Sequence, residues 1–112
     1  MATRNLFVNI AVKDLEKSKA LFSKLGFEFN AQFTSETTAS MVLSEDGYVM
    51  LLAESFFKTF TDRTPCDTKT ATEALLCISA ESRADVDELV NKALANGGKR
   101  AKDPQDHGFM YG

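Results

Sequence analysis

The chain has 112 residues, of which 44% are hydrophobic and 26% are charged, a composition typical of one ordinary soluble domain. Its longest apolar runs, such as residues 49–53, are far shorter than the roughly 18 to 20 residues that a membrane-spanning helix needs. The first residues lack the basic segment, apolar core and cleavage site of a secretory signal. A cytoplasmic protein is therefore expected.

The charges and cysteines of the chain indicate which kinds of molecule it binds. The formal net charge is −3, and lysine and arginine are scattered rather than clustered. Nucleic acids are bound through clustered cations, so a small molecule or a protein is the expected partner. Cys66 and Cys77 have no metal-binding spacing, and each is expected to be a free thiol in a reducing compartment.

The first predicted element is a strand at residues 6–12 (LFVNIAV), which are apolar or small except Asn9. Asp14 is a suitable cap for a helix that follows, and Gly26 is suited to end it. The residues expected on the buried side of this helix recur at three- and four-residue spacings: Leu15, Ser18, Leu21, Phe22 and Leu25.

Three further strands are predicted in the first half of the chain. Apolar and polar residues alternate without a break at residues 27–33, which predicts a strand with its phenylalanines on one face. Residues 39–43 and 48–53 flank Asp46-Gly47, a dipeptide that favours a tight turn. These two segments are therefore predicted to form a hairpin.

The residue composition changes at the start of the second half. Residues 55–72 contain a phenylalanine-rich start and then a threonine-rich stretch, which predicts a short helical turn and a linker. The apolar residues 73–80 (EALLCISA) predict a strand. Ser82 and Asp85 form a capping box before a second amphipathic helix. Two final strands are predicted at residues 99–102 and 107–112.

The chain repeats one unit. Placing Ile10 over Ile78 aligns NIAVKDLEKSKAL with CISAESRADVDEL, each a strand leading into a helix. The fourth strand of the first copy is centred on Leu51, and its equivalent in the second copy would fall beyond Gly112. The second module is thus expected to lack its last strand and to leave a sheet edge, which further sequence or a partner chain would cover. The expected parts of this single domain are module one at about residues 5–54, a linker at 55–72 and module two at about 73–112.

The duplicated unit and the segment VKDLEKSKALFSKLGFEF at residues 12–29 resemble the vicinal oxygen chelate superfamily. That superfamily includes glyoxalase I, extradiol dioxygenases, fosfomycin resistance enzymes and bleomycin resistance proteins. DHGFMYG at residues 106–112 resembles its penultimate strand. The resemblance implies an α+β fold of paired β-α-β-β-β modules, whose curled sheets face each other across a cavity.

The resemblance also implies four metal-ligand positions, on the first and fourth strands of each module. Carried over to this chain, three of them fall at Phe7, Leu51 and Leu75, and the fourth lies beyond the sequence. None of the three side chains can donate an electron pair to a cation. The amide of Asn9 is a poor lone ligand, and His107 is the chain's one histidine. No metal and no cofactor is therefore expected.

The alternation of strand side chains predicts an apolar cavity with a few polar points. Asn9 must be hydrogen-bonded, either to a ligand or to neighbouring backbone. His107 and Tyr111 share a face and could move a proton at the cavity rim, or the histidine could face solvent. Apolar positions could equally be core, and Cys77 a packing residue. The candidate ligand-binding residues are Phe7, Asn9, Leu51, Leu75, Cys77, His107 and Tyr111.

Three functions are compatible with these predictions. The first is a metal-free binding protein for a small organic molecule, resembling the bleomycin-resistance branch. The second is a metal-dependent enzyme of the same superfamily, a lyase similar to lactoylglutathione lyase or a dioxygenase, and catalytic residues for it are unknown. The third is a non-catalytic interaction module whose own side chains fill the cavity. A homodimer is expected, with no nucleic-acid or membrane partner.

Overall fold

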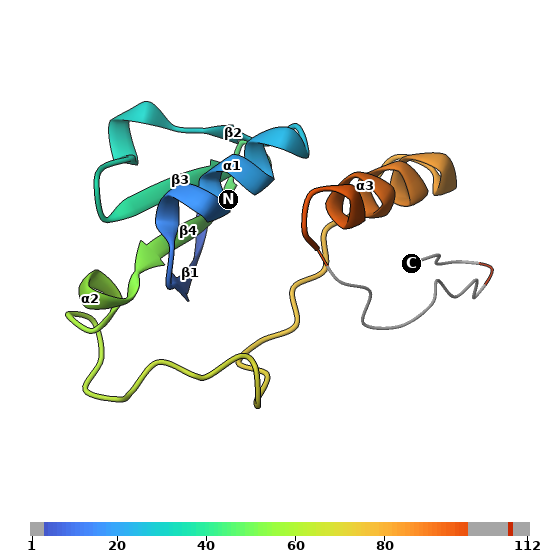
Figure 1. The fold of residues 1–112 in the computed structure, drawn as a ribbon. Coiled ribbons are helices and arrows are strands. Elements are labelled where there is room, and N and C mark those ends of the chain that lie inside the picture. The colour runs from blue at the N-terminus through green and yellow to red at the C-terminus, as the bar shows by residue number, and fades with distance from the viewer. Residues whose placement is uncertain (1–3, 99–107, 109–112) are drawn as a thin grey trace. The chain divides into compact units, whose positions relative to one another are not determined.

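The computed structural model of the chain describes residues 4–98 and residue 108. It divides into two compact units, Met1–Glu73 and Ala74–Gly112. The described part of the first unit holds a four-stranded sheet, two α-helices and a short 3-10 helix, and that of the second holds one α-helix (Figure 1). Among the described residues, no helix is long and apolar enough to cross a membrane.

The sheet of the first unit has the strand order β1-β4-β3-β2. β1 (Leu6–Val12) pairs in parallel with β4 (Gly47–Ala53), and the other neighbours pair antiparallel. β3 (Thr38–Val42) and β4 form the hairpin predicted around Asp46-Gly47. The first predicted strand and this hairpin are therefore confirmed.

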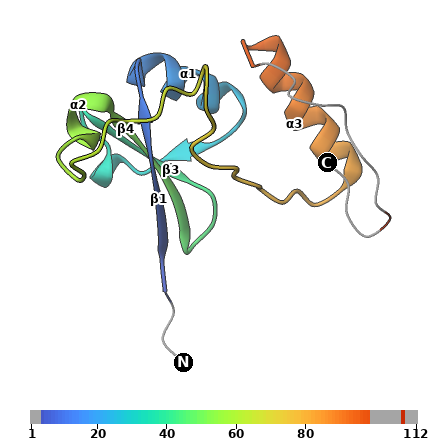
Figure 2. The same ribbon diagram turned by 90° about the horizontal axis from the view of Figure 1, so that it is seen from below.

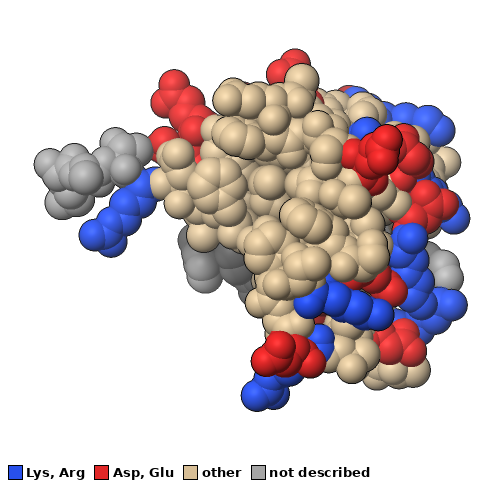
Figure 3. Space-filling model, turned by 90° about the vertical axis from the view of Figure 1, so that its left-hand side faces the viewer, with Lys and Arg blue, Asp and Glu red and all other residues tan. Residues whose placement is uncertain are grey.

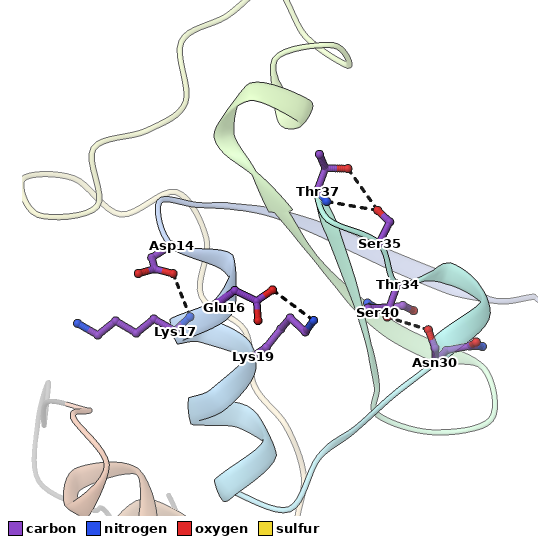
Figure 4. Close-up of polar contacts among 9 residues, drawn as sticks. All are labelled: Asp14, Glu16, Lys17, Lys19, Asn30, Thr34, Ser35, Thr37 and Ser40. Carbon is purple, nitrogen blue, oxygen red and sulfur yellow. Dashed lines mark hydrogen bonds and ion pairs between the residues drawn. The ribbon is translucent and has the colours of Figure 1, made fainter.

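Helix α1 (Leu15–Lys24) follows β1 directly and lies against one face of the sheet (Figures 1 and 2). The Asp14 side chain caps it by accepting a hydrogen bond of 3.0 Å from the Lys17 backbone N–H. Gly26 follows the helix with a φ of 97°, in the left-handed region that glycine adopts without strain. The predicted capped helix is confirmed, and its first turn is drawn in Figure 4.

The strand predicted at residues 27–33 is wrong for most of its length. Only β2 (Glu28–Phe29) is extended, and Ala31–Phe33 form the short 3-10 helix η1. The Asn30 side chain accepts a hydrogen bond of 2.9 Å from the Gln32 backbone N–H and turns the chain locally. Phe33 consequently lies 50% exposed, while Phe29 packs against the core.

The second unit also departs from expectation at its start. Residues 73–80 form no regular element, and Leu75 is 91% exposed. A strand needs a partner for its backbone groups, and none of the described residues pairs with this segment. The predicted strand there is therefore wrong.

Both helical segments predicted in the second half are confirmed. α2 (Glu54–Phe57) is the helical turn expected before the linker. α3 (Arg83–Ala95) begins at the predicted cap, where Ser82 Oγ accepts a hydrogen bond of 3.1 Å from the Asp85 backbone N–H. Except for Gly108, the strands predicted at residues 99–102 and 107–112 lie outside the described residues.

The hydrophobic core lies between α1 and the sheet. The register places Ile10 opposite Leu51, and Leu51 opposite Ala39, so these side chains share the face that α1 covers. Leu51 is 2% exposed and Ala39 is fully buried. The buried cluster consists of Leu15, Ala39, Met41, Val49 and Leu51, with Ile10, Val12, Phe22, Phe27 and Phe29 packed against it.

Leu51→Ala should lower the free energy of unfolding by about 2–5 kcal/mol, because it leaves a cavity in this core. Leu75→Ala, the same change at an exposed position, should alter it by less than about 0.5 kcal/mol. Urea denaturation of the two variants beside the unmodified chain measures both. Equal effects of the two changes would contradict the placement of Leu51 in the core.

Candidate functional site

The sheet has a second face, opposite α1, which we call the distal face. Its members follow from the register, because paired residues point their side chains to the same side. They form three rows across the strands: Phe7, Tyr48, Val42 and Glu28; then Asn9, Met50 and Ser40; then Ala11, Leu52 and Thr38.

The first row carries an aromatic pair. The rings of Phe7 and Tyr48 are stacked, with centroids 5.0 Å apart and planes 8° from parallel. The Tyr48 hydroxyl donates a hydrogen bond of 3.2 Å to the Glu45 carbonyl in the hairpin turn, which fixes its ring. Phe7 remains 45% exposed. β1 ends the sheet order, so no described strand pairs beyond it on the Phe7 side.

The second row carries two polar side chains with spare hydrogen-bonding capacity. The exposed Asn9 makes one long hydrogen bond, of 3.4 Å, from its Nδ2 to the Phe7 carbonyl. An amide can make several such bonds, so its oxygen remains available. Ser40 is fully buried, and its Oγ finds no partner among the described residues.

The backbone around Ser40 is, by contrast, fully hydrogen-bonded (Figure 4). The Ser40 N–H donates to Thr34 Oγ1 at 3.2 Å, and the Ser40 carbonyl accepts from the Asn30 N–H at 2.8 Å. Thr34 Oγ1 in turn donates to the Asn30 carbonyl at 2.7 Å. The strand position of Ser40 is therefore held firmly, whereas its hydroxyl has no partner within the described part of the chain.

The third row lies at the closed end of the distal face. Leu52 is 2% exposed and Thr38 is 8% exposed. α2 begins directly after β4 and packs against β1 and β4. The open part of the face is therefore the region around Phe7, Asn9 and Met50.

The structure separates the residues that the sequence grouped together. Phe7 and Asn9 lie on the distal face, but Leu51 points to the opposite side and is buried under α1. The prediction that Leu51 contributes to a ligand site together with Phe7 is therefore wrong. Side chains alternate along a strand, so a shift of one residue changes the face, and Met50 is the β4 residue beside Asn9.

The remaining candidates lie elsewhere in the chain. Leu75 and Cys77 are exposed residues of the irregular segment in the second unit, and their role in a cavity stays a prediction. His107 and Tyr111 lie outside the described residues. Sequence reasoning missed Tyr48, Met50 and Ser40 as members of the distal face.

The donors on the distal face do not fit a divalent metal. The described residues contain no group of three or more His, Cys, Asp or Glu side chains that could hold an ion. On the distal face itself only Glu28 carries such a side chain, and it stands on β2, three strands away from Asn9. At about 4.8 Å per strand the two lie too far apart to share one ion.

On the side shown in Figure 3, basic and acidic side chains surround a broad area without charged side chains. Among the described residues, Lys19 pairs with Glu16 at 3.6 Å and Lys92 with Glu88 at 3.1 Å, each across one turn of a helix. Such exposed pairs contribute little to stability.

Comparisons with known proteins agree with this fold. A family model described as bleomycin resistance protein-like N-terminal matches residues 4–44. A hypothetical protein from S. aureus has a similar structure, with a TM-score of 0.77, 25% sequence identity and coverage of 99% of this chain and 82% of that chain. A search of curated proteins finds no match.

A second similar structure is a glyoxalase/bleomycin resistance protein/dioxygenase family enzyme from Burkholderia phytofirmans PsJN. Its TM-score is 0.70 at 18% identity, over 94% of this chain and 83% of that chain. The chain therefore has the α+β fold of glyoxalase/bleomycin resistance-like proteins, and its resemblance to the vicinal oxygen chelate superfamily is confirmed.

Ser40→Ala should raise the free energy of unfolding by roughly 1 kcal/mol, because a buried hydroxyl without a partner is costly. Thr34→Val is the matched change at the hydroxyl that holds Ser40, and it should lower the same quantity by about 1 kcal/mol. Urea denaturation distinguishes the two signs. A loss of stability in Ser40→Ala as large as that in Thr34→Val would show that Ser40 Oγ already has a partner.

Proposed function

We propose that the chain binds a small organic molecule on the distal face, without the divalent metal usual in its superfamily. The observation that carries the proposal is Phe7. It stands where the resemblance implies a metal ligand, yet it is a half-exposed ring stacked on Tyr48. A ring in this position can bind an apolar ligand but cannot bind a cation through a lone pair.

The physical chemistry of the face supports this ligand class. A stacked aromatic pair offers a flat apolar surface, and covering it with an apolar group removes both surfaces from water. Asn9 adds a hydrogen-bonding amide one row away on the same strand, about 7 Å from Phe7. An apolar surface with a few polar groups is typical of small-molecule sites.

The described donor set does not favour the alternative of a metal-dependent lyase or dioxygenase. The word enzyme in the name of the Burkholderia relative belongs to that protein. The cytoplasmic location, the homodimer and the division into two modules remain predictions. In this proposal the chain sequesters its ligand, and no bond in the ligand is made or broken.

Phe7→Ala should weaken the binding of small aromatic compounds roughly three- to tenfold, because a stacking surface is lost. A fragment library screened by ligand-detected NMR, followed by titration of the hits, measures the change. Phe33→Ala is the control, since Phe33 is similarly exposed at 50% but lies in η1. Equal losses in both variants, or binding that neither variant affects, would contradict the site.

Titration with Ni²⁺, Zn²⁺ or Fe²⁺ should give no tight stoichiometric binding, because the distal face lacks a set of donors. Isothermal titration calorimetry of the full chain measures this. Tight one-to-one binding that Asn9→Ala or Glu28→Gln abolishes would contradict the proposal. Turnover of a thiohemiacetal or a catechol with the added metal would then favour the alternative function.

A further inference from the structure

The unpartnered hydroxyl of Ser40 and the charge of the distal face together indicate what kind of molecule binds there. We infer that the ligand is uncharged and carries a hydrogen-bond acceptor beside an apolar ring, and that Ser40 donates to this acceptor once the Met50 side chain moves aside. The inference rests on the proposed function, because it concerns the same face.

The position of Ser40 follows from the pairing. Met50 is directly opposite Asn9 on one side and Ser40 on the other, so the three residues form one row across β1, β4 and β3. Two strand spacings separate Asn9 from Ser40, roughly 10 Å. A single ring with one polar substituent can lie over Met50 and reach toward either end of this row.

Met50 is suited to act as a movable cover. It is half-buried, and side chains directly opposite each other in antiparallel strands have Cβ atoms about 4.5–5.5 Å apart, which brings Met50 beside the buried Ser40 hydroxyl. Methionine is unbranched and turns about three bonds, so it adapts to a bound group. In this inference a change of its rotamer opens a path to Ser40 Oγ, while the hydrogen bonds of the Ser40 backbone hold the strand in place.

The Ser40 hydroxyl then supplies a hydrogen-bond donor to the ligand. In the free protein it is buried without a partner among the described residues, which is unfavourable. An acceptor oxygen on the ligand would satisfy it. The binding free energy is therefore more favourable for a ligand with a hydrogen-bond acceptor than for an apolar ligand of the same shape.

The charges of the face decide between a neutral acceptor and an anion. The distal face contains no lysine, arginine or histidine among its described residues, and its one charged side chain is the carboxylate of Glu28. A carboxylate or phosphate placed over Met50 would lose its water without gaining a cation. A carbonyl or ether oxygen loses far less and still accepts from Ser40.

Three probes of similar shape test the inference: acetophenone, which is neutral with an acceptor; ethylbenzene, which has none; and benzoate, which is an anion. Acetophenone should bind the full chain roughly three- to tenfold more tightly than ethylbenzene, the contribution of one net hydrogen bond. Benzoate should bind most weakly. Chemical-shift titration by NMR gives the three dissociation constants.

The variant Ser40→Ala assigns the difference to the hydroxyl. It should reduce the affinity for acetophenone to that for ethylbenzene and leave ethylbenzene binding unchanged. The variant is expected to be at least as stable as the unmodified chain, so lost binding cannot be attributed to unfolding. In protein with ¹³C-labelled methionine methyls, acetophenone should shift the Met50 signal and not that of Met41, which lies on the α1 side.

The outcomes separate the two proposals. Equal affinity for acetophenone and ethylbenzene, or an acetophenone affinity that Ser40→Ala does not change, overturns the inference and leaves the proposed function standing. Tightest binding of benzoate overturns the inference as well. Binding of none of the probes, together with no hit in the fragment screen, overturns both.

Discussion

The parallel pairing of β1 with β4 is the constraint on which the rest of the first unit depends. It joins two segments that are far apart in the sequence, and its register places Ile10 beside Leu51 and Asn9 beside Met50. Because successive side chains point to opposite faces, this register alone assigns each residue either to the core or to the distal face. A slip by one residue would bury Asn9 under α1.

The core makes that register the favourable one. α1 buries a cluster of apolar side chains that includes Leu51 and Met41, each 2% exposed. Removing such side chains from water is the dominant favourable term in folding. With stability supplied on this side, the distal face can hold features that a core would not tolerate. These are a half-exposed ring at Phe7, a weakly bonded amide at Asn9 and an unpartnered hydroxyl at Ser40.

Much of the fold could be predicted because its signals are local. Asp14 and Ser82 mark the helix starts through hydrogen bonds within a single turn, and Asp46-Gly47 marks the hairpin. The strand expected at residues 27–33 failed through an equally local effect, since Asn30 turns the chain before the alternation can continue.

The site was harder to predict because strand register is not local. Alternation showed that Phe7 and Asn9 share a face, and the structure agrees. It could not show which residues of β4 stand beside them, because that depends on how α1 packs and on the length of the chain between the strands. The sequence therefore placed Leu51 in the site, but Leu51 points into the core. Its neighbour Met50 is the β4 residue that lies beside Asn9. Ser40 carried no sequence signal, since an unpartnered hydroxyl is visible only once its neighbours are known.

Binding of a small molecule at the distal face can be measured directly. Intermolecular nuclear Overhauser effects between acetophenone and the full chain test it most directly, because they report which protons lie within a few ångströms of the probe. We expect contacts from the probe ring to Phe7 and to the Met50 methyl group. Contacts confined to another part of the chain, such as α3, would contradict it.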